Sequence, residues 1–420
     1  MAAACAAGGW ALAQEAVDAA ASPQLEARAQ GAESTSESAT AAPRDAELAP
    51  YRAELLELAF DTASSMPLEP HVKSRSLSQE NVLLACLELD QGARAAAFAE
   101  KIENWRRGTA YAELALHCIR KGERGEHVDG FLERAHVASE APEEEIGQSW
   151  RRDRIRAKIA QAYGLLGRTA ESMMFRAELE NAEALRLSAL ESERVSDEQF
   201  DALIETLDQA ARIGDFDMIR YTLDASVALY KRFYPNEKRR AKIEERAQEY
   251  WRSAPFGLRI DVLLGFAEAA HAHDAKEHAA ELLSQTREQI ASARWLAADY
   301  SRVMKRMSRT YRDVGERAKA VECVQSALEK FEAERAEIQN FERAAALRPI
   351  AEAQAALNQM ELALATYRRA VEDGAENPNA RCRAEDLAAT ASSMALAGVE
   401  PDAELKARLV AIRAGLKAPW

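Results

Sequence analysis

Cysteine, glycine and proline are scarce in this sequence. Its 420 residues include 5 Cys, 18 Gly and 12 Pro. No two cysteines form a C-x-x-C pair, and their odd number leaves at least one thiol unpaired within the chain. The sequence therefore predicts no disulfide framework. Cys86 and Cys118 are expected as small buried thiols, with a disulfide between two adjacent helices as the alternative.

Strand patterns and long apolar runs are missing as well. No stretch alternates β-branched and polar residues between turn dipeptides, and none reaches the roughly 18 apolar residues that a membrane-spanning helix needs. Alanine, glutamate, arginine and leucine dominate instead, and these are strong helix formers. The sequence predicts an all-α protein with no membrane span.

Recognisable catalytic motifs are also lacking. The sequence contains no glycine-rich phosphate loop, no G-x-S-x-G elbow and no H-E-x-x-H helix. Its many carboxylates show no pattern that would isolate a pair in a dry cleft. A net charge of −14 opposes broad binding to nucleic acid, because the phosphate backbone rewards clustered cations. We therefore predict a protein that is not an enzyme, needs no cofactor and binds no nucleic acid.

The first 49 residues differ from the rest of the chain. Residues 1–13 end in an A-x-A-like pattern but lack a basic region, so we interpret them as a truncated signal segment. Residues 14–49 are rich in Ala, Ser, Thr and Glu and predict a disordered acidic linker. This interpretation favours export to the periplasm, with the cytoplasm as the alternative.

From residue 50 to residue 420, turn signals recur between amphipathic segments. Glycine or asparagine at such positions suits a helix end that needs a positive φ. Turn signals that recur every few tens of residues are typical of solenoids. The predicted turn residues are Gly92, Gly122, Gly167, Gly214, His273, Gly315, Asn358 and Gly398.

Large and small residues recur at fixed distances from these turns. Around Gly315 they are Met304, Met307, Ser308 and Tyr311 before the turn, then Ala320, Val324, Ala327 and Leu328 after it. Over most of residues 78–415 this pattern resembles tetratricopeptide repeats with lengthened helices. The resemblance implies a right-handed α-solenoid of about eight helix-turn-helix hairpins over residues 50–420, whose first helices line a concave groove. A divergent HEAT-like array is the alternative.

A basic stripe stands out in this acidic chain. Arg302, Lys305, Arg309 and Arg312 fall within about 80° of one another on a helical wheel, opposite the apolar residues. By the resemblance they match groove-facing positions, where they would suit an acidic or carboxylate-bearing segment of a protein or peptide partner. The alternative is a solvated basic face that pairs with acids of a neighbouring helix.

A histidine cluster offers a second candidate site. His271, His273 and His278 lie close together with Asp274. Their position at a turn argues against convergence on a metal, and Asp274 is more simply interpreted as a helix cap. We therefore predict a scaffold that binds a protein or peptide. The alternatives are a self-associating structural solenoid that forms homo-oligomers, and a metal-binding or enzymatic helical protein.

Overall fold

The computed structural model describes residues 43, 45–142, 146–192 and 195–420. Within these ranges the chain forms nineteen α-helices and one short 3-10 segment, Trp251–Ser253. The β-type pairing in these ranges consists of one isolated antiparallel bridge between Asp45 and Gln91. The all-α prediction is confirmed. The predicted signal segment and most of the predicted linker lie outside the described residues.

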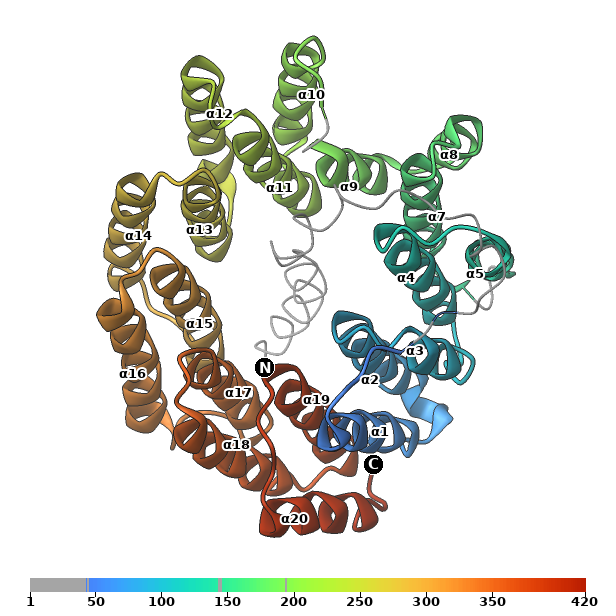
Figure 1. Ribbon diagram of the computed structural model, residues 1–420, viewed down its shortest axis with the longest axis vertical. Helices are drawn as coiled ribbons and strands as arrows, with labels where there is room; N and C mark the ends of the chain where they lie inside the picture. Colours follow the sequence, from blue (N-terminus) through green and yellow to red (C-terminus); the bar gives the residue numbers. More distant parts are fainter. Residues whose placement is uncertain (1–42, 44, 143–145, 193–194) are drawn as a thin grey trace, which may run out of the picture.

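Nine of the described helices form an inner wall, and each contacts the next along the chain (Figure 1). They are α2 (Leu68–Glu88), α4 (Arg106–Arg120), α7 (Ser149–Leu165), α9 (Asn181–Glu191), α11 (Phe216–Phe233), α13 (Phe256–Ala272), α15 (Ala297–Asp313), α17 (Asn340–Ala356) and α19 (Ala380–Ala397). The last of them, α19, contacts the first, α2. The inner wall is therefore a closed ring.

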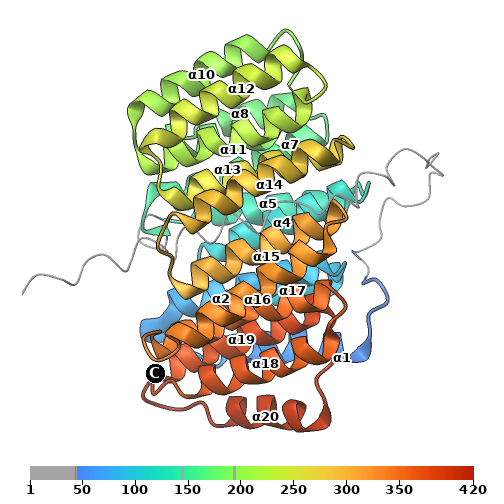
Figure 2. The ribbon, with the colours of Figure 1, turned by 90° about the vertical axis from the view of Figure 1, so that its left-hand side faces the viewer.

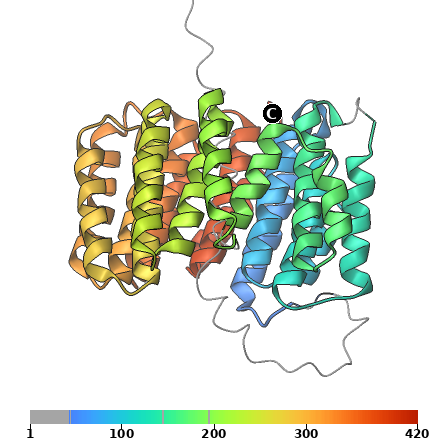
Figure 3. The same ribbon diagram turned by 90° about the horizontal axis from the view of Figure 1, so that it is seen from above.

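The other described helices cover the outside of this wall (Figure 1). They are α1 (Pro50–Ser64), α3 (Gly92–Ala99), α5 (Glu126–Ser139), α8 (Thr169–Arg176), α10 (Phe200–Ile213), α12 (Glu237–Tyr250), α14 (Lys276–Ala291), α16 (Arg317–Glu334), α18 (Met360–Ala375) and α20 (Ala403–Ala414). The helices lie side by side along the wall, as Figures 2 and 3 show from two further directions. None of the helices in the described ranges is long and apolar enough to cross a membrane.

The first and last helices of the described chain meet at a seam formed by α1, α2, α19 and α20. Leu56 and Phe60 of α1 belong to the same buried apolar cluster as Leu387 and Met394 of α19. The Tyr51 hydroxyl donates a hydrogen bond of 3.0 Å to the carbonyl of Gly398. The repeat pattern predicted a solenoid of about eight hairpins and gave no indication that its first and last described helices would pack against each other, as they do here.

Outside the seam core, α20 pairs with its neighbours on both sides. Arg413 lies 2.9 Å from Asp61 of α1, and Arg408 lies 2.6 Å from Glu372 of α18. A terminal hairpin of an open solenoid would act as a cap with an exposed outer face. The charged residues of α20 instead connect the last hairpin to the first helix.

Seven hairpins share one turn geometry. A residue with positive φ ends the first helix, and the N–H of the next residue donates to the carbonyl five positions earlier, which is the Schellman closure of a helix end. In the α15–α16 hairpin, Glu316 donates to Tyr311 over 2.8 Å. The left-handed residues are Asp90, Gly122, Gly167, Asp274, Gly315, Asn358 and Gly398.

Two of the predicted turn residues were wrong by one or two positions. The left-handed residue is Asp90 rather than Gly92, and Asp274 rather than His273, each with a φ of 59°. Aspartate tolerates this conformation because its short polar side chain can form local hydrogen bonds. Asp274 therefore forms the turn, and Ala275 rather than Asp274 precedes α14 as its N-cap residue.

Gly214 was predicted correctly as a turn residue, but its hairpin runs in the opposite sense. It adopts a φ of 77° and joins the outer helix α10 to the inner helix α11 (Figure 1). In the seven hairpins above, the first helix is the inner one. The repeat is thus interrupted between α9 and α11, and the regular order resumes with α11 and α12.

Candidate functional site

The inner side of α15 carries the predicted basic stripe. Its buried side includes Met304, Met307 and Tyr311, and the Ser308 hydroxyl donates to the carbonyl of Ala320 on α16 over 2.9 Å. Helix α16 lies outside α15 (Figure 1). Because the stripe is on the side of α15 opposite these residues, it faces the interior of the ring.

Three of the four stripe residues pair with carboxylates of their own helix. Arg302 forms an ion pair with Asp299. The side chain of Arg312 lies 2.6 Å from Asp313, and that of Arg309 lies 3.9 Å from the same carboxylate. These contacts neutralise part of the positive charge that the sequence pattern displays.

The stripe also contacts the next inner helix. Lys305 lies 2.8 Å from Glu352 of α17, and Arg312 donates a hydrogen bond of 3.2 Å to the carbonyl of Ala356. The side chains of Lys305 and Arg309 remain 37% and 49% exposed. The structure thus brings the four residues together on the inner wall and gives them acidic neighbours there.

Arg306 lies between the stripe residues but points toward α13. Its guanidinium contacts both carboxylate oxygens of Glu268, at 2.8 and 2.9 Å, and lies 3.3 Å from Asp261. Burial alone would raise the pKa of Glu268, but the charge and hydrogen bonds of Arg306 hold it below its usual value. This bidentate contact fixes the position of α15 relative to α13.

Similar ion pairs connect other neighbouring helices of the inner wall. They are Glu80–Arg106 between α2 and α4, Glu113–Lys158 between α4 and α7, and Arg348–Asp386 between α17 and α19. On α11, desolvation raises the pKa of Asp224 to about 6, with Arg220 opposing the rise and Asp261 adding to it. Ion pairs therefore connect several neighbouring helices of the inner wall.

His271, His273 and His278, the predicted histidine cluster, do not converge on one point. The His273 ring stacks on Tyr234 and lies 2.8 Å from the carbonyl of Lys231, and His278 lies 2.8 Å from the Tyr234 hydroxyl. His278 also borders a notch of about 200 Å³ between α12 and α14. In the described part of the chain, no group of three potential metal ligands includes any of these histidines.

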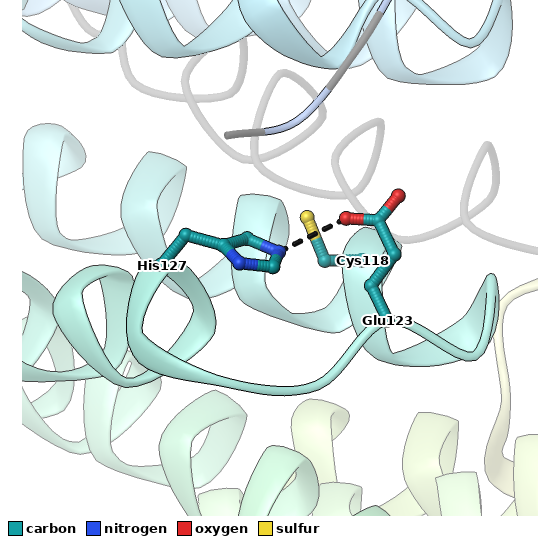
Figure 4. A group of neighbouring side chains, drawn as sticks. All are labelled: Cys118, Glu123 and His127. Atoms are coloured by element: carbon teal, nitrogen blue, oxygen red, sulfur yellow. Dashed lines mark hydrogen bonds and ion pairs between the residues drawn. The ribbon is translucent and has the colours of Figure 1, made fainter. Parts of the chain in front are cut away.

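A different set of potential ligands meets at the α4–α5 turn (Figure 4). Cys118, Glu123 and His127 each offer one ligand atom, and these three atoms lie within 4.8 Å of one another. His127 Nε2 lies 3.0 Å from Glu123 Oε2. Burial, with Glu123 adding to it, raises the pKa of the Cys118 thiol to about 12.

The backbone of this turn holds the three residues together. Gly122 adopts a φ of 83°, and Glu123 donates its N–H to the carbonyl of Cys118 over 2.9 Å. The connection is then two residues longer than in most of the hairpins, because α5 starts after Gly125, which has a φ of 115°. Glu123 directly follows Gly122, and the two extra residues before α5 place His127 beside it.

The sequence interpretation missed this cluster because its signal crosses a helix boundary. The pattern C-x4-E-x3-H fits no standard metal-binding spacing, and Cys118 was interpreted as a buried thiol or a disulfide partner, not as a metal ligand. Cys86, Cys118, Cys323 and Cys382 are all free, so the alternative disulfide between Cys86 and Cys118 is not formed.

Comparison with known proteins gives no assignment for this chain. No protein-family model matches it, and no curated protein matches it.

Proposed function

We propose that this protein is a non-catalytic scaffold of tetratricopeptide-like hairpins that holds a protein or peptide partner on its concave inner surface. The partner carries an acidic or carboxylate-bearing segment that contacts Arg302, Lys305, Arg309 and Arg312. The observation that carries the proposal is the position of this stripe on the side of α15 that faces the interior of the ring, opposite α16.

The existing ion pairs of the stripe do not prevent such binding. Arg309 and Arg312 are partly exposed and share Asp313, a residue of their own helix. Exposed pairs of this kind contribute at most about 1 kcal/mol each. A ligand carboxylate can therefore replace Asp313 at small cost, and an arginine guanidinium can bind it through two parallel hydrogen bonds.

The wall behind the stripe supports binding because it is held in place. Arg306 anchors α15 to α13 through Glu268, and Lys305 connects it to Glu352 of α17. Side chains presented by a fixed helix lose less conformational freedom on binding than side chains of a mobile loop. This arrangement fits recognition of a preformed surface and includes no step of bond making or breaking.

The test is the double variant Arg309→Glu, Arg312→Glu, with a fluorescently labelled, glutamate-rich peptide as the probe. We expect fluorescence anisotropy to show at least tenfold weaker binding, because two attractive contacts become repulsive. The matched control is Arg368→Glu, Arg369→Glu on the outer helix α18, where both arginines are also partly exposed.

Circular dichroism of both variants establishes that the fold is retained. Equal loss of peptide affinity in the two double variants would point to a general charge effect and would remove the inner-surface site. Unchanged peptide binding in the Arg309→Glu, Arg312→Glu variant would also exclude the inner-surface site.

A further inference from the structure

The α4–α5 turn differs from its counterparts in what it places over one buried sulfur atom. In seven hairpins the same backbone closure ends the first helix, and in two of them the residue whose carbonyl accepts that hydrogen bond is a cysteine, Cys86 or Cys118. After Cys86 the chain continues with Gln91 at the closure position and turns directly into α3. After Cys118 the closure residue is Glu123, and α5, which begins after a longer connection, places His127 next to it.

We propose that Cys118, Glu123 and His127 bind a thiophilic divalent metal cation, with Zn²⁺ as the natural candidate. The ligand atoms are Sγ, one carboxylate oxygen and Nε2, which lie on one side of the turn (Figure 4). This site lies at the helix turn and is separate from the proposed partner surface on α15.

The distances fit this coordination with small side-chain adjustments. A tetrahedral zinc ion with bonds of about 2.0–2.3 Å places its ligand atoms roughly 3.3–3.7 Å apart. The three atoms here all lie within 4.8 Å of one another, with Nε2 and Oε2 at 3.0 Å. Side-chain rotations of this size leave the backbone of the turn unchanged.

The charge balance also favours a divalent cation. A thiolate and a carboxylate together neutralise a charge of +2, so the occupied site is neutral and its burial carries no uncompensated charge. Cys118 lies in the apolar core, whereas the side chains of Glu123 and His127 are 34% and 12% exposed. The ion therefore has a route from solvent past Glu123, and the fourth coordination position is available to water.

The turn is held in position by hydrogen bonds that do not involve the ligand atoms. The Arg124 guanidinium donates to the carbonyls of Ile119 and Glu123, at 2.9 and 2.7 Å. His127 Nδ1 is buried and has no hydrogen-bond partner among the described residues. Coordination through Nε2 leaves the ring proton on Nδ1, so we expect weaker affinity than in sites where that proton is donated to an acceptor.

The test uses Co²⁺ as a spectroscopic substitute for Zn²⁺, on the full chain without an added histidine tag. We expect visible bands of tetrahedral Co²⁺ and a near-ultraviolet thiolate-to-cobalt band, at one ion per chain, that Zn²⁺ abolishes by displacement. Cys118→Ser should remove the thiolate band. Cys86→Ser should retain it, since Cys86 occupies the same position in a turn without the other two ligands.

Two outcomes overturn the proposal: no thiolate-to-cobalt band in the wild-type protein, or a band that persists in Cys118→Ser. If Cys118→Ser does not fold, Glu123→Gln and His127→Ala replace it, because both side chains are partly exposed. Each should weaken Co²⁺ binding by roughly tenfold or more, and unchanged affinity in both variants would equally exclude the site.

Discussion

Two arginines of α15, one turn apart in sequence, have different surroundings. Arg306 is 24% exposed and contacts Glu268 and Asp261 of α13, whereas Arg309 is 49% exposed and lies 3.9 Å from Asp313 of its own helix. Arg306 donates two charge-assisted hydrogen bonds to one carboxylate of a neighbouring helix, whereas the contact of Arg309 is longer and lies within its own helix. The same residue type is therefore structural at one position and available for binding at the other.

This difference predicts the effects of two matched substitutions. Arg306→Met should lower the free energy of unfolding by about 1.5–3 kcal/mol, because Glu268, which is 42% exposed, loses two charge-assisted hydrogen bonds to the guanidinium. Arg309→Met should change it by less than about 1 kcal/mol. Urea denaturation followed by circular dichroism measures both values, and similar losses would contradict the assigned roles.

At the residue scale, the sequence predicted the stripe and, as the alternative interpretation, its pairing with acids of a neighbouring helix, but it did not identify which acids. Arg302, Lys305, Arg309 and Arg312 share one helix face because of the 3.6-residue period alone. Glu352, which pairs with Lys305, lies 47 residues further along the chain. Such a contact depends on how α15 and α17 pack, which no local pattern contains.

Individual elements were predictable where the turn chemistry was specific. Glycine or asparagine marks five of the seven Schellman turns, and these five positions were predicted correctly. Asp90 and Asp274 were missed because aspartate adopts a positive φ less often, and its side chain suggests a helix cap equally well. The reversed hairpin at Gly214 was missed because a turn signal does not reveal which of its two helices lies inside the ring.

Close contact between α11 and α13 depends on a glycine. A Cβ added at Gly265 would lie 2.6 Å from Val227 Cγ1 and 2.9 Å from its Cγ2. Valine in a helix is restricted to one main rotamer, so its methyl groups cannot move away easily. Gly257 lies in the same helix but has no atom within 4 Å of an added Cβ.

The two glycines give a prediction at the scale of one helix pair. Gly265→Ala should destabilise the protein by about 1–3 kcal/mol, because α11 and α13 must separate. Gly257→Ala should be neutral or stabilise it by up to about 1 kcal/mol through the lower entropy of the unfolded chain. Thermal and urea denaturation of both variants check the sign of each change, and a loss at Gly257 equal to that at Gly265 would contradict the packing argument.

At the scale of the whole molecule, ring closure is the feature that the sequence did not predict. The repeat pattern describes contacts between consecutive hairpins, and the described chain forms them. Whether the two ends then meet depends on small angles between helix pairs that accumulate along the chain. The apolar residues of α1 and α19 indicate that each helix has a buried side. They do not indicate which helix packs against that side.

Spin labels test the closure directly. Glu54 of α1 and Lys406 of α20 form an ion pair across the seam. Spin labels at these two positions should show one short label-to-label distance by pulsed electron paramagnetic resonance. The control is the pair Arg287 and Glu322 on α14 and α16, which lie 3.0 Å apart and stay close in an open or a closed arrangement. A long or broad distance at the seam beside a short control would show that the ring is open.

The seam formed by α1, α2, α19 and α20 has a consequence for how this molecule comes apart. In an open array, each terminal unit is supported on one side only and frays first. Here every inner helix of the described chain has a neighbour on both sides, so rupture at one place leaves a connected strip in which all the remaining interfaces persist. To separate the helices into two blocks that are joined by the polypeptide alone, two helix–helix interfaces must break at the same time. The closed ring should therefore unfold more slowly than a linear array of the same hairpins.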